Sequence, residues 1–176
     1  EWEAVQKEYL TQDELIILAK TPCKIDVLKR ASLFSCLTGL RISDIENLTW
    51  NNLRIAPDKG PCVRIRTQKT STEAILPISY EALELCGERG EGKVFKGLTR
   101  SMINVPLKHW IEASGIKKHI TFHCFRHTYA TLQIAAGTDI YTVSKMLTHK
   151  SVVTTQIYAD LVSSKKRETV DKIKLK

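Results

Sequence analysis

The chain has 176 residues, of which 43% are hydrophobic, enough for one well-cored domain of ordinary globular composition. No apolar run approaches the ~20 residues that a membrane-spanning helix needs, so we expect a soluble protein without a membrane partner. The excess of Lys and Arg over Asp and Glu gives a net charge of +8, which favours a polyanionic partner.

The cysteines are odd in number and widely spread, without a C-x-x-C pair: Cys23, Cys36, Cys62, Cys86 and Cys124. This pattern is typical of reduced thiols in a cytosol and argues against a disulfide framework or a zinc ribbon. The first twenty residues carry acidic side chains and lack the apolar core of a secretory signal. Because the chain opens at Glu1 without Met, we expect it to be a fragment of a longer protein.

Two helices are predicted in the first 40 residues. Thr11 and Glu14 have capping-box spacing, in which each side chain satisfies a free backbone N–H of the other residue, so a helix should start there and end before Pro22. Residues 24–38 are apolar over much of a helical circumference, which predicts a buried helix that ends at Gly39.

A third helix is expected directly afterwards. Ser43 and Glu46 repeat the capping-box spacing and predict its start. Arg41 should therefore lie in a tight corner between two helices, beside a helix N-terminus.

The sequence pattern changes from helical to β-prone at residues 53–78. Two turn clusters, P-D-K-G and Q-K-T-S-T, separate three short β-prone runs. In the middle run Val63 and Ile65 alternate with Arg64 and Arg66, as in a strand that is wet on one face. We expect a small antiparallel sheet.

Helical patterns then resume and continue to the basic end of the chain. The predicted segments are Tyr80 to Cys86, Thr99 to Ser114, Phe122 to Ala136, Ile140 to Leu147 and Val152 to Val162. The predicted fold is α+β, a mostly helical single domain with a small three-stranded antiparallel sheet.

The stretch "HCFRHTYATLQIAAG", residues 123 to 137, places two histidines and an arginine within five positions. His123 and His127 have the spacing of two zinc ligands on one helix face, but the glutamate of H-E-x-x-H is missing and Arg126 lies between them. His123 and Arg126 instead share the first turn of a helix, where free N–H groups and the dipole favour an anion. An isolated pair of this kind is also compatible with a capping histidine and a surface arginine.

Four segments in order decide between these readings: "TGLRISDI", "HCFRHTYAT", "LTHKS" and "IYAD". Together they resemble the boxes of the tyrosine recombinase, or phage integrase, family and cover the chain from Arg41 to Tyr158. The resemblance implies the tyrosine recombinase catalytic fold over residues 1–164, followed by a basic tail at 165–176. It also implies that the core-binding domain that precedes the catalytic domain in this family is absent from this fragment.

The resemblance implies a metal-free active site with no cofactor. Arg41 and Arg126 match the arginines that clamp the scissile phosphate, and Tyr158 matches the nucleophile. A phenol with an ordinary pKa of ~10 needs cationic and hydrogen-bonding neighbours to attack at neutral pH. His123 matches the acid/base histidine, and His149 the late histidine that hydrogen-bonds a phosphate oxygen.

Lys69, in the turn "TQKTST", matches the general acid that protonates the leaving 5′ oxygen, with Lys59 in the earlier turn as the fallback. Thr148 stands where the family usually has Gly. Asp44 matches an acidic residue that supports the first arginine, although a first-turn acid favoured by the helix dipole is an equal alternative. His127 is expected to be structural or to support the site rather than to react.

The implied function is site-specific DNA recombination without metal or ATP, through a 3′-phosphotyrosyl intermediate and a free 5′ hydroxyl. The implied partners are a double-stranded attachment site and a homotetramer on DNA, with a monomeric isolated domain, in a prokaryotic cytoplasm beside the nucleoid. Expected phosphate contacts come from the sheet and the tail: Arg64, Arg66, Lys165, Lys166 and Arg167. Two rivals remain: a type IB topoisomerase, and a non-catalytic binding module that uses residues 137–161 as a helix-turn-helix.

Overall fold

The computed structural model describes residues 8–57, 59–66, 73–148, 156 and 175. It forms two compact units, residues 1–129 and 130–176, and the site residues discussed below that fall within the described ranges belong to the first. None of the helices in the described ranges is long and apolar enough to cross a bilayer.

Helix α1, Gln12–Lys20, begins as predicted. The Thr11 hydroxyl accepts a hydrogen bond from the Glu14 amide at 3.2 Å, and the Glu14 carboxylate accepts one from the Thr11 amide at 2.9 Å. Lys118 donates to the same carboxylate at 2.8 Å and so attaches the start of α1 to the loop before the later site helix. This capping box therefore also contributes to tertiary structure.

Helix α2, Asp26–Thr38, is the buried centre of the first unit and ends at Gly39, as the sequence predicts. Gly39 takes φ 77°, a left-handed conformation that favours glycine, and its amide caps the helix through the Ser35 carbonyl. The chain can therefore reverse sharply towards Leu40 and Arg41.

The second predicted capping box is wrong. Helix α3 is Ile42–Asn47, so Ser43 lies inside it and Arg41 occupies the N-cap without a side-chain capping bond. The prediction of Arg41 in a corner at a helix N-terminus is nevertheless confirmed. Glu46 does not reach back to the helix start, because its carboxylate binds Arg100 from a distant loop.

Three antiparallel strands follow in the order β1-β2-β3: Leu53–Ile55, Pro61–Arg66 and Glu73–Pro77. A short 3₁₀ turn, Trp50–Asn52 (η2), leads into them. Val63 pairs with Leu53 on one side and Leu76 on the other, and all of these side chains are buried. Arg64 and Arg66 are exposed, so the predicted alternation is confirmed.

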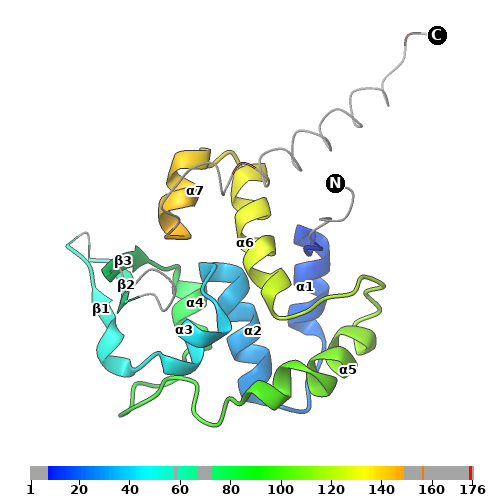
Figure 1. The fold of residues 1–176 in the computed structure, drawn as a ribbon, viewed down its shortest axis with the longest axis horizontal. Coiled ribbons are helices and arrows are strands. Elements are labelled where there is room, and N and C mark those ends of the chain that lie inside the picture. Colours follow the sequence, from blue (N-terminus) through cyan, green and yellow to red (C-terminus); the bar gives the residue numbers. More distant parts are fainter. Residues whose placement is uncertain (1–7, 58, 67–72, 149–155, 157–174, 176) are drawn as a thin grey trace. The chain divides into compact units, whose positions relative to one another are not determined.

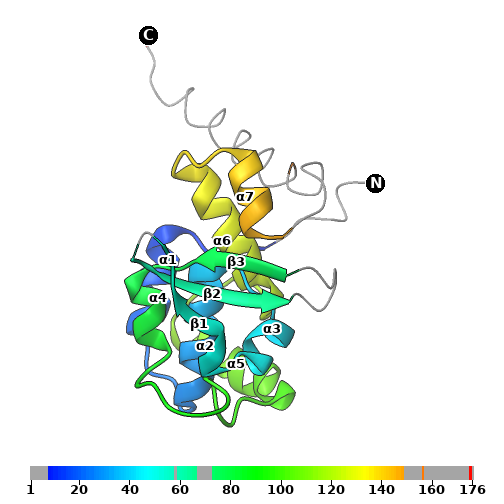
Figure 2. The ribbon, with the colours of Figure 1, turned by 90° about the vertical axis from the view of Figure 1, so that its left-hand side faces the viewer.

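Figures 1 and 2 show the sheet on one side of α2 and α1 on the opposite side. Helix α4, Tyr80–Leu85, packs against α2. This arrangement encloses α2 within the first unit and leaves the end of β2 at Arg66 beside α3.

The helix predicted from Thr99 to Ser114 is divided. A 3₁₀ turn, Arg100–Ile103 (η3), is followed by α5, Val105–Ala113, with Asn104 between them. Pro106 gives the reason: within one continuous helix its ring would clash with the carbonyl four residues earlier, whereas the first turn of a new helix accepts it.

Helices α6, His123–Ala135, and α7, Ile140–Met146, agree with their predicted ranges within one residue at each end. Asp139 caps α7 by accepting a hydrogen bond from the Thr142 amide at 2.9 Å. The helix predicted from Val152 to Val162 lies outside the described residues, apart from Gln156. The five cysteines are all free thiols, as expected.

Thr128 joins α6 to the segment before α1. Its fully buried hydroxyl accepts a hydrogen bond from the Leu10 amide at 2.9 Å and donates one to the Cys124 carbonyl at 2.8 Å. Thr131, one turn later, is also buried, but its hydroxyl has no hydrogen-bond partner among the described residues. Replacing each threonine with the isosteric valine therefore compares a buried hydroxyl that forms hydrogen bonds with one that forms none among the described residues.

We expect Thr128→Val to lower the free energy of unfolding by about 1–3 kcal/mol, because it leaves the buried Leu10 amide without an acceptor. Thr131→Val should be neutral or stabilising, since the hydroxyl that it removes gains no hydrogen bond within the described structure. Urea unfolding of both variants measures the difference. Equal losses would contradict the role given to the bond between Leu10 and Thr128.

Candidate functional site: a cationic pocket beside α3 and α6

The corner after α2 and the first turns of α6 bring two predicted arginines to one place. Arg126 is 4% exposed, and its Nη1 donates a hydrogen bond to the Gly39 carbonyl at 2.6 Å. Gly39 belongs to the reversal that leads to Arg41, so Arg126 is fixed to the backbone that presents Arg41. The two residues are far apart in sequence, and this buried bond determines their relative position.

A pocket of about 360 Å³ lies at this corner, and its described lining includes no Asp or Glu. It collects three of the predicted site residues, Arg41, His123 and Arg126, together with a third guanidinium, that of Arg100. Polar uncharged groups complete the lining: Ser35, Ser43, Asn104 and Thr121. Such a site is suited to a bound anion, because guanidinium forks match the oxygens of a phosphate.

His123 and His127 lie one turn apart at the start of α6, with ring centroids 4.6 Å apart in an edge-to-face arrangement. His123 is exposed at the pocket, whereas His127 is 6% exposed. Within the described ranges no group of three or more His, Cys, Asp or Glu side chains is placed to hold a metal ion. The first imidazole therefore faces the pocket, and the second lies in the core below it.

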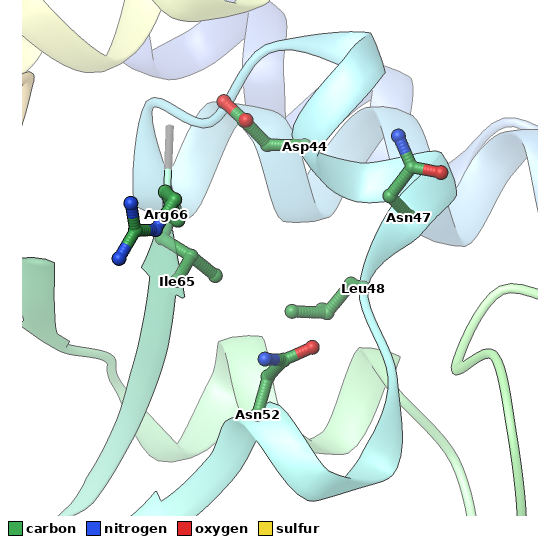
Figure 3. Close-up of a pocket in the computed structure, with 6 residues that line it drawn as sticks. All are labelled: Asp44, Asn47, Leu48, Asn52, Ile65 and Arg66. Atoms are coloured by element: carbon green, nitrogen blue, oxygen red, sulfur yellow. The ribbon is translucent and has the colours of Figure 1, made fainter. Parts of the chain in front are cut away.

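Asp44 is 7% exposed and borders a second, smaller pocket of about 100 Å³ (Figure 3). Asn47 and Leu48 line it from α3 and its end, and Ile65 and Arg66 line it from β2. Within the described residues Asp44 and Arg41 form no ion pair, so the supporting role of Asp44 stays a prediction. The pocket does establish that β2 ends beside the first turn of α3.

Several predicted site residues lie outside the described ranges. They include three of the proposed catalytic residues and the three predicted DNA contacts of the tail: Lys69, His149, Tyr158, Lys165, Lys166 and Arg167. Of the predicted DNA contacts on the sheet, Arg64 is paired with Glu73 and Arg66 borders the pocket of Figure 3. Both are exposed on the wet face, which suits contact with a polyanion.

Sequence reasoning missed Arg100 and Arg54. Arg100 lies 59 positions after Arg41, and only the fold brings it to the rim of the same pocket. Arg54 is exposed on β1 opposite Cys62, which places it on the same sheet face as Arg64. The alternation of apolar and polar residues in "LRI" could have placed Arg54 on the exposed face of a strand. No local pattern indicates that Arg100 lies near the site.

Tyr129 is the tyrosine closest in sequence to the site, and its environment differs from that of a nucleophile. It is 5% exposed, and burial raises the pKa of its phenol from 10.0 to about 12, although nearby Arg126 acts in the opposite direction. Because its side chain is almost fully buried, Tyr129 is a core residue.

Comparison with known proteins agrees with this geometry. The model of the phage integrase family matches residues 8–165, and the chain belongs to this family. A protein named "Tyrosine recombinase" from Thermosipho africanus (strain TCF52B) is 27% identical over 177 residues, which cover 94% of this chain and 62% of that protein. The chain thus spans less than two thirds of the length of this relative.

Solved structures share the fold. The XerA recombinase has a TM-score of 0.73 at 25% identity, covering 94% of this chain and 62% of that one. A lambda integrase tetramer bound to a Holliday junction has a TM-score of 0.69 at 22% identity, covering 88% and 48%. The predicted fold class, a mostly helical α+β domain with a three-stranded antiparallel sheet, is confirmed.

Proposed function

We propose that this chain is the catalytic part, residues 1–164, of a site-specific DNA recombinase that cleaves one strand through Tyr158. The observation that carries the proposal is the pocket that gathers Arg41, His123 and Arg126 without a carboxylate in its described lining. Family membership supports the same chemistry, because the relatives of this chain include proteins named tyrosine recombinases.

The two arginines supply the charge that the reaction needs. During attack on a phosphodiester, negative charge grows on the non-bridging oxygens, and fixed cationic donors stabilise it most strongly where water is excluded. Arg126 suits this task because burial and its bond to the Gly39 carbonyl limit its movement. Arg41 is half-exposed at the helix corner and can meet the same phosphate from the side of α3.

Tyr158 attacks the phosphorus, forming a 3′-phosphotyrosyl bond and releasing a 5′ hydroxyl. The phenolic proton passes to a base, for which we propose His123, because it lines the pocket and an imidazole nitrogen can accept a proton. His149 would donate to a phosphate oxygen. The 5′ hydroxyl of a partner strand then reverses the step, so that the phosphodiester energy is conserved without ATP.

Lys69 is proposed as the general acid, and the sheet supports it over Lys59. β2 ends at Arg66, next to Asp44 of α3, and three residues of extended chain from there to Lys69 span at most about 11 Å. Lys59 lies in the turn at the opposite end of β2, a strand whose six residues extend over roughly 17 Å. The Lys69 end of the sheet is therefore the end nearer to Arg41.

The proposed partner is a double-stranded attachment site in a prokaryotic cell, bound by a homotetramer. Arg64 and Arg66 on the wet sheet face, with Lys165, Lys166 and Arg167 of the basic tail, would contact backbone phosphates and position the duplex without reading its sequence. We propose that residues 165–176 dock in a groove of a neighbouring subunit on DNA, and that the isolated domain is a monomer.

The proposal is tested by incubating the chain with a nicked suicide substrate in EDTA. We expect a covalent protein–DNA adduct that resists denaturant, at an unchanged rate in the chelator, because guanidinium groups take the place of metal charge. A parallel reaction with added Mg²⁺ or Zn²⁺ is the control. Cleavage that is lost in EDTA and restored by either ion would revive the zinc reading of His123 and His127. Duplex binding with no adduct under any condition would favour the non-catalytic binding module.

A further inference from the structure

Arg100 is a third guanidinium at the pocket, contributed by a segment that none of the family-like boxes contains. It lies at the start of η3, lines the pocket with Arg41 and Arg126, and its side chain is 57% exposed. No acidic residue lines the described pocket, and Glu46, which pairs with Arg100, is not among the lining residues. The guanidinium of Arg100 is therefore a third group of N–H donors at the pocket, beside those of Arg41 and Arg126.

Glu46 holds Arg100 by one edge only. Nε and Nη2 of Arg100 donate to the Glu46 carboxylate, with Nε to Oε1 at 3.0 Å and Nη2 to Oε1 at 2.8 Å. A guanidinium has five N–H donors in a planar fork, so Nη1 and the second hydrogen of Nη2 remain for another acceptor. Among the described residues no other partner of Arg100 occurs. The carboxylate thus orients the fork and leaves one edge unused.

Folding stability alone does not account for this pair. Arg100 and Glu46 are 57% and 23% exposed, and an ion pair in that setting contributes little to stability. The bidentate geometry does determine position, because it links the loop before α5 to α3, the helix whose N-cap is Arg41. The ion pair therefore places the guanidinium of Arg100 at a defined point on the pocket rim.

We infer that Arg100 is a positioning residue that binds a DNA phosphate next to the scissile one, and that Glu46 orients it for that contact. This inference rests on the proposed function. Arg41 and Arg126 hold the reacting phosphate, while Arg100 fixes the neighbouring one and so sets the register of the strand in the pocket. Glu46 is not expected to touch the DNA.

The test places one neutral methylphosphonate at a time on each phosphate that flanks the cleavage site of a suicide substrate. In the wild-type chain, one flanking substitution should slow cleavage about 10- to 100-fold, the effect expected for one lost hydrogen bond to a charged group. Arg100→Ala should show a loss of similar size on unmodified DNA. The same methylphosphonate should not lower the cleavage rate of Arg100→Ala any further. Methylphosphonates at the other positions should slow this variant as much as they slow the wild-type chain.

Glu46→Ala should reproduce part of the Arg100→Ala loss at the same phosphate, and Glu46→Gln, which retains one acceptor oxygen, should lose less. Arg100→Lys should recover part of the rate, since it keeps the charge but not the fork. Lys20→Ala removes one exposed cation from α1, which does not line the pocket, and should leave every rate unchanged. Thermal melting should show all variants folded.

Two outcomes separate this inference from the function on which it rests. If Arg100→Ala keeps the complete wild-type pattern of methylphosphonate effects while the wild-type chain forms adducts, the positioning role is overturned and the proposed function stands. If the wild-type chain forms no adduct on any substrate, the proposed function fails, and the inference fails with it.

Discussion

Replacing Tyr158 with Phe is expected to abolish covalent attachment to DNA and to leave duplex binding almost unchanged. The substitution removes one hydroxyl oxygen, which is the attacking atom, and retains the aromatic ring. Trapping on a nicked suicide substrate measures the attachment, and a mobility shift on intact duplex measures the binding. An adduct that persists in Tyr158→Phe would remove Tyr158 from its proposed role.

Two other tyrosines provide the controls. Tyr80 is 67% exposed at the start of α4, so Tyr80→Phe makes the same chemical change at a surface position and should not alter the adduct yield. Tyr129 is the more demanding control because it lies beside Arg126 in sequence. Its side chain is 5% exposed and is not part of the pocket lining, so Tyr129→Phe should leave attachment intact.

Lys69→Ala should give the second large effect, a loss of about 10²- to 10⁴-fold in cleavage of ordinary DNA. The leaving 5′ alkoxide is a strong base and departs slowly unless it is protonated. In a substrate with sulfur at the bridging 5′ position, the leaving group is a thiolate, which departs without protonation. This substrate should therefore restore cleavage by Lys69→Ala. Single-turnover rates on the two substrates measure the rescue.

Arg41→Ala is the matched control for this experiment. The charge of Arg41 acts on the non-bridging oxygens, which are the same in both substrates. Sulfur at the leaving position should therefore not restore cleavage by Arg41→Ala. Lys59→Ala should cleave both substrates at the wild-type rate. Rescue of Lys59→Ala in place of Lys69→Ala would mean that the acid comes from the other turn of the sheet.

Local sequence patterns were reliable where the side chains had no distant competitor. The capping box of Thr11 and Glu14 is present as predicted. The same spacing at Ser43 and Glu46 failed, because the Glu46 carboxylate binds Arg100, which is 54 residues away. A capping pattern carries no information about such a distant partner. Glu46 therefore forms a bidentate ion pair with Arg100 in place of the predicted capping bond.

The site could be predicted as a set of residues but not as an arrangement. The resemblance named Arg41, His123 and Arg126, and the fold brings them to one pocket. The hydrogen bond that fixes Arg126 to the Gly39 carbonyl spans 87 positions and has no signature in either segment. Arg100 joined the site for the same reason: long-range packing, rather than spacing, decides which cations share a pocket.

In the proposed reaction Tyr158 becomes linked to a 3′ phosphate of DNA. The most direct measurement is mass spectrometry of the trapped adduct after digestion with nuclease and protease. We expect a single modified peptide containing Tyr158, which carries a nucleotide through its 3′ phosphate, together with a free 5′ hydroxyl on the other DNA fragment. A nucleotide on any other residue, or a linkage through a 5′ phosphate, would contradict it.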